Sequence, residues 1–109
     1  QAGGEREYRI ALHLYPNDPN VYAGLADRYR MAGLCTPAIP LFRESLRLGP
    51  WSTVARSRLI QCLVHTGDFV GAEAELTEKT RRQDADVNQV RAMIDSAKQA
   101  PGPASPLAR

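Results

Sequence analysis

The side chains that could carry out catalysis are few in this sequence and lie far apart. Its two histidines, His13 and His65, are widely separated, and neither lies beside a serine or cysteine in a nucleophile motif. The chain also has no glycine-rich loop of the phosphate-binding kind. Because no nucleophile, base and orienting group come together, we expect no catalytic residues, no cofactor and no enzymatic activity.

Metal binding and redox chemistry find equally little support. Cys35 and Cys62 belong to no CxxC or cysteine–histidine motif, so we predict neither a zinc site nor a redox-active pair. Both lie in apolar segments, where a free cysteine behaves as a small core residue. The redox state of these two thiols, and with it the compartment, stays open. The carboxylates of Asp84 and Asp86 are interpreted as helix caps and polar linker.

The charged residues are nearly balanced. Lysine and arginine together number 14 against 12 aspartates and glutamates, which leaves a net charge of +2. This charge gives no field that would attract nucleic acid or an anionic membrane. No apolar run approaches the roughly 20 residues that a helix needs to cross a bilayer, so we expect no membrane insertion by this segment and leave its localisation unknown.

The one basic cluster contains Lys79, Arg81 and Arg82. These residues closely follow three glutamates, which are Glu73, Glu75 and Glu78. Opposite charges three and four positions apart pair on the surface of a helix. We therefore interpret the cluster as a solvated helix face with ion pairs along it.

The elements that hold these residues recur along the chain. A shift of 34 residues aligns apolar residues with apolar residues and turn residues with turn residues. The aligned sets are Tyr8, Phe42 and Leu76; Leu25, Leu59 and Met93; Ala26, Ile60 and Ile94; Gly33 and Gly67; and Pro16 and Pro50. These are the residue classes that a repeated backbone geometry preserves, so the shift predicts a repeated structural unit.

Each period contains the signals of two helices. One apolar stripe has the i, i+3, i+4, i+7 spacing of a helix and consists of Tyr22, Leu25, Ala26 and Tyr29. Asp18-Pro19 predicts the N-cap of this helix, and Gly33 predicts a left-handed cap at its end. Thr36-Pro37 predicts the start of the second helix, which tolerates Pro40 near its first turn. Gly49-Pro50 predicts its end.

The following period repeats these signals. Its first helix is expected from Thr53 to Thr66, and Asp68 is expected to cap the second. A last helix is expected to begin at Asp84 or Asp86. Trp51 lies in the turn between the two periods, and we expect it to pack between the helix before it and the helix after it; the alternative is an exposed anchor for a partner.

These residues resemble the tetratricopeptide repeat signature. The matching landmarks are Tyr22-Ala23-Gly24-Leu25-Ala26, Tyr29, Gly33, Ala38, Phe42, Leu46 and Pro50. The next repeat departs from the pattern at Arg56, which stands in place of an aromatic residue, and at Lys79, which stands in place of a small residue. The resemblance implies an all-α fold, a right-handed α-solenoid of antiparallel helix pairs with about two and a half repeats and a C-terminal capping helix.

The predicted domain covers residues 1–99. Its parts are a half repeat at 4–16, repeats at 18–50 and 52–82, and a capping helix at 84–99, followed by a disordered tail or linker at 100–109. The half repeat matches only the second helix of a repeat. We therefore expect this chain to be the C-terminal part of a longer protein or a subunit of a larger assembly.

The resemblance also implies a partner-binding surface. Stacked helix pairs form a concave face lined mainly by the first helix of each pair, and a protein or peptide partner would bind there. The residues expected on that face are Asn20, Ala23, Asp27, Arg30, Val54, Ser57, Arg58, Gln61, His65, Asn88 and Arg91, with Arg30 and Arg58 as the preferred anchors. One variant of the family holds a chaperone's C-terminal carboxylate, but its positions here are Ala23, Asp27, Arg58, Asn88 and Ala92, so that function is not expected.

Two alternatives remain beside an interaction scaffold. The chain could be a docking appendage of an enzyme or membrane protein encoded upstream. It could also self-associate, as a homo- or hetero-oligomer, through the half-repeat face of Tyr8, Leu12 and Tyr15.

Overall fold

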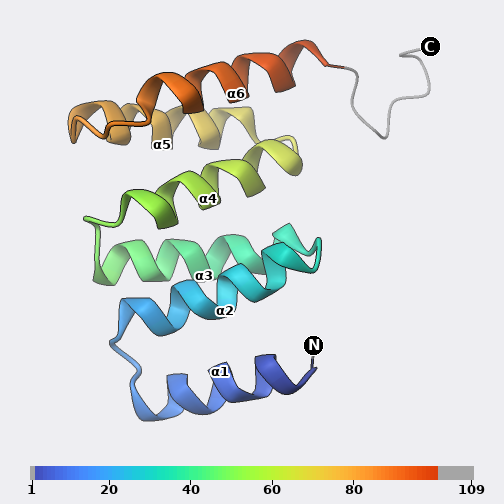
Figure 1. The fold of residues 1–109 in the computed structure, drawn as a ribbon, viewed down its shortest axis with the longest axis vertical. Coiled ribbons are helices and arrows are strands. Elements are labelled where there is room, and N and C mark those ends of the chain that lie inside the picture. The colour runs from blue at the N-terminus through green and yellow to red at the C-terminus, as the bar shows by residue number, and fades with distance from the viewer. Residues whose placement is uncertain (1, 101–109) are drawn as a thin grey trace.

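Every regular element of the described chain is an α-helix. The computed structural model describes the backbone of residues 2–100, together with the side chains of residue 6 and of residues 9–100. Within that range the helices are α1 (Ala2–Leu14), α2 (Pro19–Met31), α3 (Cys35–Leu48), α4 (Thr53–His65), α5 (Phe69–Arg81) and α6 (Val87–Gln99) (Figure 1). Of the predicted tail, residues 101–109 lie outside the described residues.

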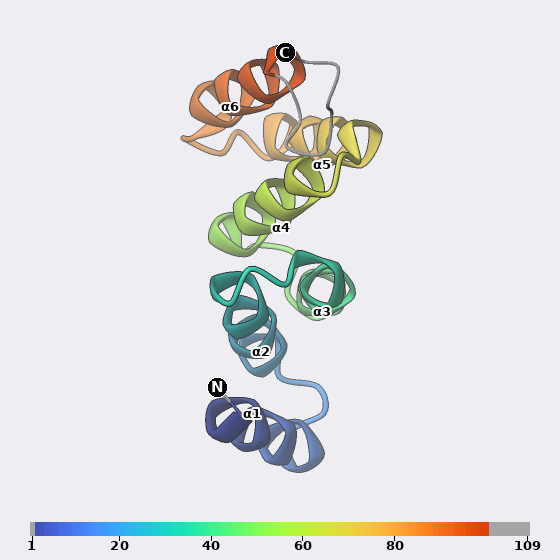
Figure 2. The ribbon, with the colours of Figure 1, turned by 90° about the vertical axis from the view of Figure 1, so that its right-hand side faces the viewer.

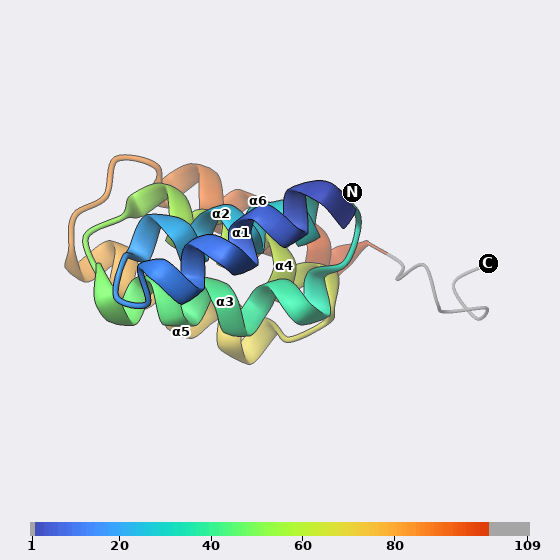
Figure 3. The same ribbon diagram turned by 90° about the horizontal axis from the view of Figure 1, so that it is seen from below.

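The helices form an elongated stack. Successive helices pack on one another, and α4 also touches α2 and α6, so α2, α4 and α6 line one side while α3 and α5 lie on the other (Figure 2). Viewed along the stack, the helices overlie one another (Figure 3). The radius of gyration is 14.8 Å, above the roughly 13 Å of a globular domain of this length. The all-α solenoid is confirmed, whereas its right-handed superhelix and the residue limits of the repeats stay predictions.

Many of the buried core residues occupy positions that recur every 34 residues, such as Ala38 and Ala72, or Phe42 and Leu76. Phe42, Leu59 and Ile60 are completely buried where α3 meets α4, and Ala38 and Ala72 let neighbouring helices approach closely. Each buried leucine, isoleucine or phenylalanine stabilises the fold by about 1.5–3 kcal/mol relative to an exposed one. The periodicity of the sequence is therefore the periodicity of the buried seam.

Side-chain caps begin three of the helices. Asp18 accepts a hydrogen bond from the backbone N–H of Asn20, and Asp68 accepts one from that of Gly71, as the sequence predicted. Ser52 caps α4 by accepting from the N–H of Ala55. These bonds satisfy backbone donors that have no partner inside a helix.

One predicted helix start is wrong, and another is confirmed without its predicted side-chain cap. Thr36 does not cap α3, because that helix already begins at Cys35, one residue after the turn that ends α2 at Gly33 and Leu34. Asp86 stands at the N-cap position of α6, but its side chain makes no capping hydrogen bond, because that carboxylate is held by side chains of other helices.

The prediction for Trp51 is also wrong. Its side chain is 73% exposed and does not fill a gap between helices. The chain turns from α3 into α4 between Gly49 and Ser52, and Pro19 already occupies the space beside Gly49, where an added Cβ would lie 3.0 Å from Pro19 Cγ. The indole therefore stays outside, near Gly49.

Three helix ends share one hydrogen-bond pattern. After α2, the N–H of Leu34 donates to the carbonyl of Tyr29, and α4 and α5 end with the equivalent bonds from Asp68 and Asp84. This is the Schellman motif, which needs one residue with positive φ. Gly33 and Gly67 supply it at φ values of 80° and 85°, but after α5 the position is taken by Gln83 at 59°.

We expect opposite effects from two substitutions at the positive-φ position, one in the motif after α5 and one in the motif after α4. Gln83→Gly should raise the free energy of unfolding by about 0.5 kcal/mol, because it relieves the cost of a left-handed conformation in a residue with a Cβ. Gly67→Ala should lower the free energy of unfolding by about 1 kcal/mol. The added Cβ would have no atom within 4 Å outside Gly67 and its chain neighbours, so only the backbone conformation is penalised. Urea unfolding followed by circular dichroism measures both values; equal signs for the two variants would contradict the assignment.

Candidate functional site

The surface formed by α2, α4 and α6 carries the predicted binding residues, and we call it the first-helix face (Figure 2). Five of them are exposed, namely Asn20, Val54, Gln61, His65 and Asn88. The other six are partly buried, namely Ala23, Asp27, Arg30, Ser57, Arg58 and Arg91. Whether these residues bind a partner stays a prediction, but their contacts show which of them act together.

Four predicted residues meet between α2 and α4. One oxygen of Asp27 accepts a hydrogen bond from Arg30 Nε at 2.7 Å, and the other lies 3.2 Å from Arg58 Nη1. Arg30 Nη1 also donates to Gln61 Oε1 at 3.4 Å, a long and weak bond. A single carboxylate thus orients two guanidinium groups that belong to different helices, and this four-residue network carries one net positive charge.

Other predicted residues are engaged elsewhere. Ser57 donates to Asp86 Oδ2 at 2.7 Å and so connects α4 with the residue before α6. Arg91 reaches sideways to α5, where its two terminal nitrogens donate to both oxygens of Glu73 at 2.8 and 2.6 Å. The structure therefore places Arg91 apart from the network of Asp27, Arg30 and Arg58.

Apolar side chains are exposed beside the polar ones. Val54 lies in the first turn of α4, close in sequence to the exposed Trp51, and Met31 ends α2 with its side chain largely in solvent. Trp51 as an exposed anchor was the alternative to its burial, and Met31 was not among the expected binding residues. Their hydrophobic type suggested burial, and only the arrangement of the helices shows that no neighbour covers them.

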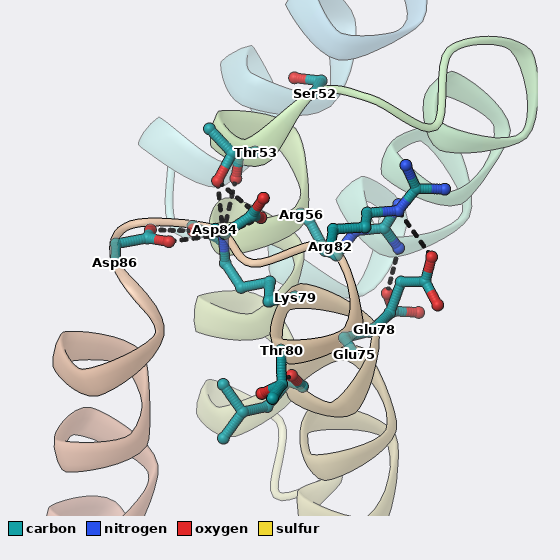
Figure 4. Close-up of polar contacts among 12 residues, drawn as sticks. Ser52, Thr53, Arg56, Glu75, Glu78, Lys79, Thr80, Arg82, Asp84 and Asp86 are labelled. Atoms are coloured by element: carbon teal, nitrogen blue, oxygen red, sulfur yellow. Dashed lines mark hydrogen bonds and ion pairs between the residues drawn. The ribbon is translucent and has the colours of Figure 1, made fainter.

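Lys79 was assigned to a solvated helix face, and this is wrong. Its side chain is 0% exposed, and it points from α5 toward the start of α4 and the loop before α6 (Figure 4). Its Nζ donates to Thr53 Oγ1 at 2.7 Å, Asp86 Oδ1 at 2.8 Å and Asp84 Oδ2 at 3.0 Å. The same Asp84 oxygen accepts from the Thr53 hydroxyl at 2.8 Å.

We call this cluster of four residues, Lys79, Thr53, Asp84 and Asp86, the lysine lock. A buried ammonium needs opposite charges and hydrogen-bond acceptors, and the two aspartates supply both. Burial acts to raise the pKa of Asp84 and of Asp86, but hydrogen bonds from Lys79, with Thr53 at Asp84 and Ser57 at Asp86, outweigh it, so both pKa values are lowered. The aspartates are therefore ligands of a buried lysine rather than helix caps.

Arg56 is the second polar residue that replaces a family landmark. Its guanidinium is buried, and it donates to Glu75 Oε1 at 2.7 Å and to the carbonyl oxygen of Pro50 at 2.9 Å. Its Nε has no hydrogen-bond partner. The long aliphatic stem fills the place of an aromatic ring while the charged end reaches α5 and the turn before α4.

The rest of the basic cluster behaves as expected. Arg81 and Arg82 both pair with Glu78, at spacings of three and four residues on α5. Hydrogen bonds from these two arginines lower the pKa of Glu78 to about 2. Surface pairs of this kind stabilise a helix only slightly.

Among the side chains that the structure describes, those of residue 6 and of residues 9–100, no group of three or more histidine, cysteine, aspartate or glutamate residues could hold a metal ion. Lys79 is the buried amine of the site, and a group without solvent exposure cannot meet a substrate. None of the helices in the part of the chain that the structure describes is both long and apolar enough to span a bilayer.

Comparison with models of protein families gives a match for this chain. A family model described as "Tetratricopeptide repeat" covers residues 37–94, which include most of α3, all of α4 and α5, and the first half of α6. No curated protein matches the chain.

Replacement of the buried lysine tests the lysine lock. Lys79→Met should lower the free energy of unfolding by about 2–4 kcal/mol near neutral pH, because Asp84 and Asp86 then face each other without an ammonium. The pKa values of both aspartates are lowered in the fold, so their contribution is complete above the ordinary aspartate pKa and is lost as the pH falls through the folded values. The difference from the unchanged protein should therefore shrink on acidification to about pH 3 in thermal unfolding experiments.

Lys98→Met is the matched control. Lys98 pairs with Glu73 at 2.7 Å on the surface, so its loss should change the free energy of unfolding little at any pH. If Lys79→Met were as mild as Lys98→Met, or if its effect grew in acid, the lysine lock would not be stabilising.

Proposed function

Because this chain belongs to the tetratricopeptide repeat family, we propose that its first-helix face binds an extended segment of a partner protein. Repeats of this family generally mediate protein–protein interactions and are non-catalytic scaffolds. The observation that carries the proposal is the network between α2 and α4, in which one carboxylate holds Arg30 and Arg58 side by side.

The charge of this network defines the anchor of the partner. Asp27 neutralises one of the two guanidinium groups, so one positive charge remains to be matched. The side chain of Arg58 is 42% exposed, whereas that of Arg30 is 26% exposed, so Arg58 is the more accessible of the two. An aspartate or glutamate of the partner would complete a charge-assisted pair with Arg58. Arginine is also among the residues that contribute most to binding energy at interfaces.

The neighbouring residues fit the remainder of an extended segment. The exposed amides of Asn20, Gln61 and Asn88 can both donate to and accept from a peptide backbone. Val54 adds an exposed apolar contact at the start of α4. The face therefore suits a segment with an acidic residue flanked by an apolar one, held by its main chain as well as by its side chains.

Selection from a phage-displayed library of random peptides tests this function. We expect selected peptides to contain an acidic residue and Arg58→Ala to weaken their binding at least about tenfold in titrations. Arg43→Ala is the control, because Arg43 is an exposed arginine on α3, outside the first-helix face, and should leave affinity unchanged. An empty selection, or peptides that depend on Arg43 but not on Arg58, would refute the proposal.

Self-association is a second candidate function, and a specific observation favours it. Ile10 and Leu14 lie one helical turn apart on α1 with their side chains mostly in solvent, and Tyr15 follows them, also exposed. Of the expected face, Tyr15 is exposed and Leu12 is partly buried, while the side chain of Tyr8 is outside the described residues. The exposed apolar stripe of Ile10 and Leu14 would pair with its copy in a second molecule.

Sedimentation velocity distinguishes this candidate from a monomer. If α1 forms a dimer contact, the chain should sediment as a dimer at high concentration, and Leu14→Lys should return it to a monomer, because a charge cannot be buried there unpaired. Val70→Lys on α5 is the control, since Val70 is the most exposed large apolar residue and lies on another helix. A monomer at every concentration excludes the candidate.

A further inference from the structure

Cys35 and Cys62, whose redox state the sequence left open, form a disulfide in this structure. Their Cα atoms are 5.1 Å apart, within the usual range for a disulfide. Cys35 is the first residue of α3, and Cys62 lies in the last turn of α4. The bond therefore joins the second helix of one predicted repeat to the first helix of the next.

We propose that this disulfide is an inter-repeat staple that sets the spacing of α2 and α4 on the first-helix face, and that the chain works in an oxidising compartment. Stable disulfides form in such compartments and are rare where thiols are kept reduced. The part of the proposal that concerns partner binding rests on the function proposed above, whereas the staple and the compartment do not.

The position of the bond connects it to the binding network. Cys35 directly follows the turn that ends α2, only a few residues after Arg30. Cys62 is the neighbour of Gln61, which accepts from Arg30, and lies about one turn after Arg58. A covalent bond at this point ties the end of α2 that carries Arg30 to the part of α4 that carries Gln61. The distance between the two arginines is therefore restrained by more than their shared carboxylate.

Burial makes the staple a lasting part of the structure. Cys35 is 9% exposed and Cys62 is 0% exposed, and both belong to the apolar core. Thiol–disulfide exchange requires a thiolate to reach a sulfur atom, so the folded protein resists reduction. The bond closes a loop with a sequence separation of 27, which limits the freedom of the unfolded chain.

Formation of the bond needs an oxidant, which we assign to the class of dithiol–disulfide oxidoreductases. One cysteine thiolate attacks the disulfide of the oxidant and forms a mixed disulfide, which releases one thiolate of the oxidant. The second cysteine thiolate then attacks the first cysteine's sulfur and releases the other thiolate. In total, two thiols lose two protons and two electrons, and the oxidant is reduced to its dithiol.

The first experiment asks whether the bond forms. The chain is directed to the periplasm of a bacterial host, denatured without reductant, treated with iodoacetamide and weighed by mass spectrometry. We expect no alkylated cysteine and a mass lower by two hydrogen atoms than that of the reduced chain. Two alkylated cysteines in periplasmic material would overturn the proposal.

The second experiment asks what the bond does. Reductant added to the unfolded chain before refolding should lower the melting temperature by about 10 °C or more, and a Cys35→Ala/Cys62→Ala variant should melt at a similarly reduced temperature whether or not reductant is present. Backbone amides of α3 and α4 should exchange hydrogen faster in the reduced protein and in the variant than in the oxidised protein. The exchange rates of α5 and α6 should change less. Equal melting temperatures for oxidised and reduced protein would overturn the staple.

Binding supplies the link to function. A peptide from the selection described above should bind the reduced protein several-fold more weakly, and Arg43→Ala should not alter this ratio. Equal affinity would exclude an effect of the staple on the first-helix face. If the selection yields no peptide, the function fails, while the mass and melting measurements still decide the staple.

Discussion

Phe42, Leu59 and Ile60 are buried together where α3 meets α4, and this contact between successive helix pairs is the constraint on which the other features depend. A helix in such a stack has to bury apolar surface against the helix before it and the helix after it, so no pair is stable by itself. This requirement holds α2, α4 and α6 on one side, and only then can residues from different helices meet on a common surface. The network of Asp27, Arg30, Arg58 and Gln61 is thus a consequence of the apolar seam.

Two further connections are added to this seam, one covalent and one ionic, and each acts between neighbouring helix pairs. The disulfide of Cys35 and Cys62 connects α3 with α4, and the lysine lock connects α5, α4 and the loop before α6. Both occupy buried positions that apolar side chains could have filled. A buried ion pair adds little net stability over such side chains, but it fixes one arrangement because any other leaves a charge unpaired. The lysine lock therefore determines where α6 lies on the last repeat.

The fold could be predicted from the sequence because the residues that begin and end each helix act on their close neighbours in the chain. Asp18, Gly33 and Asp68 act at helix ends through neighbours in the chain, so their roles followed from residue type and spacing. Lys79 and Trp51 could not be predicted in this way. A lysine among glutamates on a helix resembles a surface pair, and a lone tryptophan resembles a core residue, until the positions of the aspartates and of Pro19 are known. The meeting of Asp27 and Arg58 likewise depends on how two helices lie side by side.

The two connections along the stack also differ in what can loosen them. The bond between α3 and α4 is covalent and yields only to a reductant, whereas α6 is held by the buried Val90 and Ile94 and by the lysine lock, whose ion pairs weaken in acid. A molecule lying along the whole surface would therefore meet a stiff half and a compliant half. On binding such a molecule, α6 would move relative to α4. The distance between Arg30 and Arg58 would stay the same.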